Sequence, residues 1–202
     1  LFVAGKGDDT EENHANVIHT IPVTLLLGGC YFIGALVVFT FLLFSTIRMR
    51  RLIHSYPACN YAKYKLIICP EKIVSFSWGN TIVLSQEDYE RNPGEILLHE
   101  QMHLQHRHTW DLLWMECIMI LHWFNPAAWL LMRELREVHE YEADNGVINN
   151  GIDATEYQLL LVKKSVGTRL YSMACGFNHS KLKNRITMML KRRTNNWARL
   201  KL

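Results

Sequence analysis

The stretch that decides the architecture is residues 21–47, IPVTLLLGGCYFIGALVVFTFLLFSTI, which contain no Asp, Glu, Lys or Arg. This run is longer than the roughly 20 apolar residues that a helix needs to cross a bilayer. Its bulky apolar side chains leave no polar face, which is typical of a helix in lipid; a buried core helix is the alternative. A signal peptide fits poorly, because arginines follow the run instead of preceding it. We therefore predict a transmembrane helix over residues 21–47.

The charges on either side of this helix predict its orientation. Residues 1–12 are net negative, whereas Arg48, Arg50 and Arg51 follow the apolar run directly. Because basic residues favour the cytoplasmic side, we expect residues 1–20 to be extracytoplasmic and the chain after the helix to face the cytoplasm. The sequence begins with Leu1 and not with Met, so we expect it to be an internal piece of a longer protein.

The composition excludes several other classes of protein. The chain has 202 residues, of which 49% are hydrophobic, so it is not disordered and can bury a core. Its five cysteines form no C-x-x-C pair, which argues against a disulfide framework or a thiolate zinc site. Basic residues accumulate after Glu156 without a nucleic-acid recognition motif. The negative cytoplasmic leaflet explains them, so we expect no direct contact with nucleic acid.

After the membrane helix, residues 48–62 are predicted to be a cytoplasmic linker. Apolar runs predict two or three short strands between about 65 and 85, with Gly79-Asn80 as a two-residue hairpin turn. Proline, asparagine and glycine punctuation predicts helices over about 93–108, 109–123 and 126–148, with weaker signals over 154–170 and 180–192. The predicted fold class is α+β: a transmembrane helix followed by a mainly helical domain with a small β-sheet.

Residues 112–132 are a second apolar stretch with a single charge, Glu116. A second straight membrane crossing is one interpretation of this stretch. Glu116, His122 and the Asn125-Pro126 break favour a helical hairpin within residues 110–148, which is either buried or dips into the membrane.

The residues that carry the chemistry are His99-Glu100-Gln101-Met102-His103. On a helix, positions i and i+4 share a face, so both imidazoles can bind one metal ion. Glu100 lies beside that pair and can accept a proton from water. The apolar residues Ile96–Leu98 predict that this helix is half-buried, as such a site requires. His106 and His108 are read as the polar end of the same helix.

The third metal ligand is expected from the later helix, which carries Glu140 and Asp144 four residues apart. That spacing lets Glu140 reach the metal while Asp144 hydrogen-bonds the far nitrogen of a ligand histidine. Glu137 and Glu142 are expected to point to other faces. The alternative is a solvated acidic face paired with Arg133 and Arg136.

The segment from Glu95 to Val147 resembles the M56 family of membrane metallopeptidases, to which the bacterial BlaR and MecR sensor-transducers belong. The resemblance rests on H-E-Q-M-H, on the block Leu121–Pro126 (LHWFNP) and on Glu140-x-x-Ala-Asp144. It implies a zincin-like metallopeptidase domain over residues 63–195, with residues 196–202 as a basic juxtamembrane end. It implies His99, His103 and Glu140 as Zn²⁺ ligands and Glu100 as catalytic base. Ala143 stands where the family often has Cys.

The same resemblance implies a multi-pass protein of the bacterial inner membrane with its metallopeptidase site facing the cytoplasm. The expected function is a zinc metalloendopeptidase of a sensor-transducer that cleaves a cytoplasmic transcriptional repressor, itself, or both. The lipid bilayer is the other expected partner, and a homodimer is left open. We expect an edge strand near 80–85 to hold an extended substrate. His122, His139 and Tyr141 are unranked candidates for stabilising the oxyanion.

Two other functions compete with this one. An M48-type quality-control protease shares H-E-x-x-H and a Glu-x-x-x-Asp on a later helix, but the short interval from His103 to Glu140 and the Trp-Phe-Asn-Pro block favour M56. A membrane signalling scaffold with an idle metal site is the non-enzymatic alternative, against which the intact Glu100 counts. Many scattered cleavages would indicate the first, and no cleavage the second.

Overall fold

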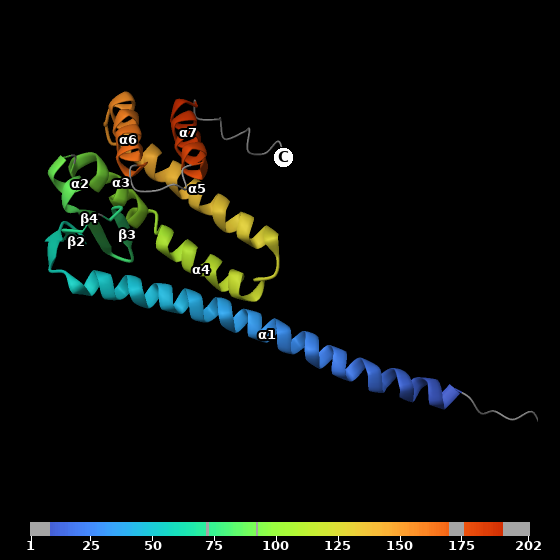
Figure 1. Ribbon diagram of the computed structural model, residues 1–202. Helices are drawn as coiled ribbons and strands as arrows, with labels where there is room; N and C mark the ends of the chain where they lie inside the picture. Colours follow the sequence, from blue (N-terminus) through green and yellow to red (C-terminus); the bar gives the residue numbers. More distant parts are fainter. Residues whose placement is uncertain (1–8, 72, 92, 170–175, 192–202) are drawn as a thin grey trace, which may run out of the picture.

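Figure 1 shows the computed structural model, which describes residues 9–71, 73–91, 93–169 and 176–191. Helix α1 (Asp9–Ser55) extends far beyond the rest of the molecule, and a compact group of strands and helices lies along its C-terminal half. The structure is mostly helical with a small mixed sheet, so the predicted α+β class is confirmed.

Helix α1 contains the predicted membrane segment but is longer than predicted. Its portion Val23–Ser55 is long and apolar enough to cross a membrane, and none of the apolar window is buried in the protein. The helix continues through Arg48–Ser55, which was predicted to be linker, because no helix-breaking residue occurs before Pro57. Ile53 of this extension packs against the sheet, which explains why the helix continues.

The rest of the predicted linker is strand β1 (Ala58–Tyr61), which begins a four-stranded sheet. The other strands are β2 (Tyr64–Cys69), β3 (Phe76–Trp78) and β4 (Thr81–Ser85), and the strand order is β1-β2-β4-β3. Strands β2 and β4 pair in parallel, and the other two pairs are antiparallel. The predicted turn joins β3 to β4, with Gly79 at a φ of 63°.

The sheet order corrects one prediction. Strand β4, predicted as the edge near residues 80–85, lies inside the sheet with all five residues buried, because β2 pairs along its other side. The free edge beside β4 belongs to β3. One face of the sheet carries Leu66, Ile82 and Leu84, which pack against Ile96, Leu97 and Leu104 of the first long helix of the domain.

The helices of the domain follow the sheet in the order α2 (Gln86–Arg91), α3 (Pro93–Gln105), α4 (His108–Leu121), α5 (Pro126–Asn149), α6 (Ala154–Arg169) and α7 (Gly176–Leu190). Helix α3 ends before the predicted residue 108, because Arg107 adopts a left-handed conformation with φ 59°. Helix α2 was not predicted, and Asn92, directly before α3, lies outside the described residues.

Helices α4 and α5 form an antiparallel hairpin, so residues 112–132 are not one straight crossing. The turn lies between Leu121 and Pro126, and the side chain of Asn125 caps α5 by accepting a hydrogen bond from the N–H of Ala127 at 2.9 Å. Met115 and Met119 of α4 pack against Ala128 and Met132 of α5 in a separate small core.

Candidate metal centre

Helix α3 carries the two histidines of the H-E-x-x-H stretch on one face, one turn apart. Their Nε2 atoms lie 3.2 Å from each other. Helix α3 packs on the sheet through Ile96, Leu97 and Leu104, and this packing fixes which way the histidines point. The spacing of four residues therefore produces the shared face that the sequence predicts.

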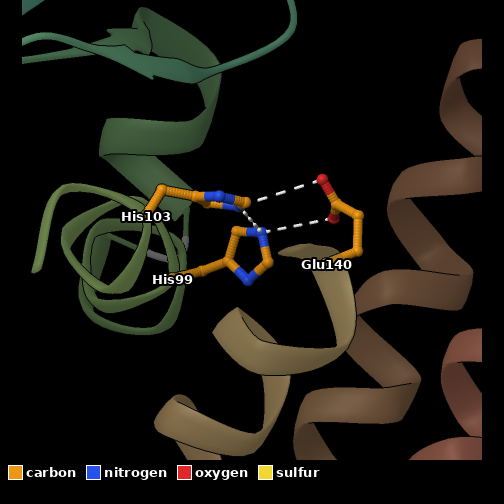
Figure 2. A group of neighbouring side chains, drawn as sticks. All are labelled: His99, His103 and Glu140. Carbon is orange, nitrogen blue, oxygen red and sulfur yellow. Dashed lines mark hydrogen bonds and ion pairs between the residues drawn. The ribbon is translucent and has the colours of Figure 1, made fainter. Parts of the chain in front are cut away.

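Glu140 approaches this pair from α5, as Figure 2 shows. One carboxylate oxygen lies 3.5 Å from Nε2 of His99, and the other lies 3.8 Å from Nε2 of His103. The three side chains can offer ligand atoms that all lie within 4.8 Å of one another, so they could hold one metal ion. Two imidazole nitrogens and a carboxylate oxygen are a donor set that suits Zn²⁺.

Packing between α3 and α5 brings the carboxylate to the histidines. Met102 of α3 lies against the backbone of α5 at Gly146, where an added Cβ would come within 2.6 Å of the methionine side chain. A residue larger than glycine would therefore displace the Met102 side chain or push the helices apart. The three side chains line one side of a cavity of about 550 Å³.

Glu100 points into the same cavity and is almost fully buried, with 6% of its surface exposed. Burial raises the pKa of its carboxyl group, while the charge of His99 and a hydrogen bond with Ser77 oppose that rise. Ser77 belongs to the edge strand β3, so the sheet edge and the carboxyl group share the cavity. A buried carboxyl group with a raised pKa is suited to exchange protons near neutral pH.

Asp144 lies one turn beyond Glu140 and is 1% exposed. Its Oδ1 atom lies 3.3 Å from Nδ1 of His99, the ring nitrogen on the far side from Glu140. The hydroxyl group of Tyr157 lies between them, 2.9 Å from Nδ1 of His99, and donates a hydrogen bond to Asp144 at 2.8 Å. These contacts favour the tautomer of His99 that leaves Nε2 free to bind a metal.

Arg185 of α7 contacts both carboxylates that lie beside His99, those of Asp144 and Glu140. Its guanidinium donates to both oxygens of Asp144, at 2.8 and 2.6 Å, and also lies 2.9 Å from Glu140. Arg185 was predicted only as one of the basic residues after Glu156 that the negative cytoplasmic leaflet explains, and Tyr157 was not predicted as a site residue. Both residues lie on later helices, and their distance along the sequence from H-E-x-x-H does not predict that they contact it.

Together, burial, hydrogen bonds and neighbouring charges raise the pKa of His99 and lower the pKa of His103 and of Glu140. Burial lowers the pKa of His99, but hydrogen bonds to Asp144 and Glu140 outweigh burial and raise it to about 9. Burial and the charge of His99 lower the pKa of His103 to about 3. Burial raises the pKa of Glu140, but the hydrogen bond to His99 and the charge of Arg185 lower it to about 2. Glu140 is thus held as an ionised carboxylate beside the two histidines.

The remaining candidate residues lie around this centre. Nδ1 of His103 lies 2.8 Å from Nδ1 of His108, whose Nε2 lies 3.1 Å from Glu142. His139 stacks on His108 with ring centroids 4.0 Å apart and lines the cavity together with Tyr141. His122 lies exposed at the far end of α4, so it does not belong to the cavity.

Glu137 and Glu142, which were predicted to point to other faces, pair with side chains other than His99 and His103, and Glu137 lines the same cavity. Glu137 pairs with Arg133 and accepts a hydrogen bond from Tyr141. The acidic side of α5 is therefore divided: Glu140 and Asp144 face the metal centre, and Glu137 and Glu142 pair with other side chains.

A helix that carries two histidines and a second helix that supplies a carboxylate define a metallopeptidase-like site. A family model described as BlaR1 peptidase M56 matches residues 3–189. The chain belongs to the M56 peptidase family, a family of membrane-associated metallopeptidases. No curated protein matches the chain.

Proposed function

We propose that this protein is a zinc metalloendopeptidase of a membrane sensor-transducer. Its substrate is a cytoplasmic regulator, the protein itself, or both. The observation that supports catalysis most strongly is the buried Glu100 beside His99, His103 and Glu140 in one cavity. Arg48, Arg50 and Arg51 follow the membrane segment, which supports a cytoplasmic orientation of residues 63–195.

In this proposal His99, His103 and Glu140 would hold Zn²⁺, which would supply a Lewis acid able to polarise a peptide carbonyl and to lower the pKa of water. Glu100 accepts a proton from the attacking water and passes it to the leaving amine. Asp144, Tyr157 and Arg185 hold His99 and Glu140 in place through the hydrogen bonds described above.

The edge strand β3 supports a role in binding an extended peptide. It pairs with β4 on one side and lines the cavity through Phe76 and Ser77. A substrate segment can pair with its free side and thereby lie across the cavity. His139 and Tyr141 line the same cavity and stay candidates for stabilising the oxyanion.

The test compares cells that carry the wild type with cells that carry Glu100→Gln, by a census of protein N-termini in membranes and cytosol. We expect one or two new termini with the wild type only, and these termini identify the substrate. Glu95→Gln, at the first turn of the same helix, is the matched control and should cleave like the wild type.

Other results of this census would overturn parts of the proposal. Full cleavage by Glu100→Gln would remove Glu100 from the catalytic role. Many scattered termini with the wild type would indicate a quality-control protease. Absence of new termini in both strains, relative to cells that lack the protein, under every growth condition tested would indicate a signalling scaffold with an idle site.

A further inference from the structure

We propose that the tip of the α4–α5 hairpin, residues 112–132, is embedded in the lipid bilayer beside α1. The first observation is that the hairpin tip contacts α1 inside the apolar run. The hydroxyl group of Tyr31 donates to the carbonyl of Leu121 at 2.9 Å, and the indole N–H of Trp123 donates to the carbonyl of Tyr31 at 3.2 Å. Tyr31 lies inside the apolar run, about 15 Å along the helix from Ile21 and about 24 Å from Ile47.

Close packing of the Trp123 ring against the backbone of α1 at Gly34 fixes the same contact. The ring of Trp123 lies so near Gly34 that an added Cβ would come within 2.2 Å of it. Gly28 and Gly29, on the same helix, have nothing within 4 Å of such an atom. The turn of the hairpin is therefore seated at one particular depth on α1, well inside the apolar run.

The second observation is the composition of the exposed surface of the hairpin tip. Its only charged residue is Glu116, and charges resume immediately outside it at Asp111 and Arg133. The large apolar side chains that it exposes by more than half are Trp114, Leu121, Phe124, Trp129, Leu130 and Leu131. A surface of this kind in water is costly, whereas lipid covers it without cost.

The third observation is that the polar groups of the turn have partners within the protein. The N–H of His122 donates to Ile118, the side chain of Asn125 caps α5, and the indole N–H of Trp129 donates to the carbonyl of Trp123. The carbonyl of Leu121 accepts from Tyr31. Irregular backbone is tolerated at membrane depth when its hydrogen bonds are satisfied in this way.

Lipid is favoured over a protein partner because the hairpin tip continues the surface of α1. Phe32 and Leu36 of α1, near the contact, are 72% and 60% exposed, and the portion Val23–Ser55 is apolar enough to span a membrane. Because the exposed apolar surfaces of α1 and of the hairpin tip lie at the same depth, the lipid that surrounds α1 also surrounds the hairpin tip. A water-soluble partner would have to enter the bilayer to cover either of them.

This placement brings the metal centre close to the membrane surface. His108 is the first residue of α4 and contacts His103, so the base of the hairpin adjoins the candidate ligands. The peptide bonds that the protein cuts must then come close to the membrane surface. This consequence rests on the proposed function, whereas the embedding of the hairpin tip does not.

The natural cysteines allow a direct test with a spin label on the full chain in phospholipid vesicles. Cys117 is exposed on α4, and Cys59 is exposed on β1. Replacing Cys30, Cys59 and Cys175 by serine leaves Cys117 as the accessible thiol, since Cys69 is buried. A companion variant keeps Cys59 instead of Cys117. Collisions of each label with oxygen, which concentrates in lipid, and with a nickel chelate, which stays in water, are then measured.

We expect the label at Cys117 to collide with oxygen at least several times more often than with the chelate, and the label at Cys59 to show the reverse. Chelate collisions at Cys117 equal to those at Cys59 would place the hairpin tip in water. Low collision rates with both reagents would show that protein covers it. Either result overturns the proposal, and neither bears on whether the protein is a peptidase.

A glycine substitution tests the contact with α1 by an independent route. Gly34→Val should displace Trp123 and change the depth reported by the Cys117 label, whereas Gly28→Val should leave that depth unchanged. An unchanged depth in Gly34→Val would show that the contact with α1 does not position the hairpin tip.

Discussion

At the scale of single residues, Arg185 stabilises two carboxylates of the candidate metal centre, Asp144 and Glu140. Its contacts with Asp144 are bidentate, and Asp144 is almost fully buried. Removing one partner of a buried ion pair leaves the other charge without compensation. Arg185 is therefore expected to act on stability first and on metal binding through Glu140.

Arg185→Ala should lower the free energy of unfolding by about 3 kcal/mol, because the carboxylate of Asp144 loses its cation. Arg185→Lys should recover only part of that loss, since an ammonium group cannot bind both oxygens in the same plane. Thermal unfolding in detergent micelles measures both. Lys183→Ala, an exposed change on the same helix, is the control. An Arg185→Ala protein as stable as the wild type would contradict this account.

The pKa of His99 makes a prediction about how metal binding depends on pH. A pKa of about 9 means that His99 carries a proton at pH 7, and this proton must leave before Nε2 can bind a metal. His103, with a pKa of about 3, is already neutral. The apparent Kd for Zn²⁺ should therefore fall about tenfold for each pH unit from pH 7 to 8.5. Titration against a competing chelator measures this slope, and a flat profile would contradict it.

Part of the site could be predicted from the sequence because its residues lie on two helices at helical spacing. His99 and His103 share a face of α3, and Glu140 and Asp144 share a face of α5. Tyr157 and Arg185 could not be predicted, because they reach the site from α6 and α7 through packing that no local spacing encodes.

At the scale of elements, the packing of α3 on α5 sets the distances between the candidate ligands. Gly146 allows the two helices to approach at Met102, which lies three residues after the candidate ligand His99 on α3, while Gly146 lies two residues after Asp144 on α5. The sequence predicted both helices but not this contact, since a glycine within a helix carries no information about its neighbour.

Gly146→Ala should strain this contact, because the new methyl group would overlap the side chain of Met102. The cost is expected to be about 1–3 kcal/mol of stability, with metal affinity lowered about tenfold as the carboxylate moves from the histidines. Gly94→Ala is the matched control on α3, since a Cβ there meets no atom within 4 Å. Equal affinity for Zn²⁺ in the two variants, measured with a chelator, would show that this contact does not position the ligands.

The sheet shows where element-level prediction fails. The turn at Gly79-Asn80 is a local signal and was predicted correctly, with β3 and β4 on either side. The edge was assigned to the wrong strand, because strand order depends on the parallel pairing of β2 with β4, which is a contact between segments distant in sequence. The edge strand that lines the cavity beside Glu100 is therefore β3.

At the scale of the whole molecule, the fold combines one long apolar helix with a domain whose candidate metal centre lies at the base of the α4–α5 hairpin. The apolar run of α1 was predictable because a long uncharged stretch has few alternatives. Its extension to Ser55 was not, since it depends on Ile53 packing against the sheet. The M56 family model matches residues 3–189, so the match includes both the long apolar helix and the domain.

The central claim is that His99, His103 and Glu140 together hold one zinc ion and that Glu100 does not. Metal content per chain, measured on purified protein by mass spectrometry under native conditions, tests this claim most directly. We predict one zinc ion per chain in the wild type and in Glu100→Gln, and loss of most of the metal in Glu140→Ala. Full zinc content in Glu140→Ala would contradict the account and transfer the third-ligand role to another carboxylate of α5.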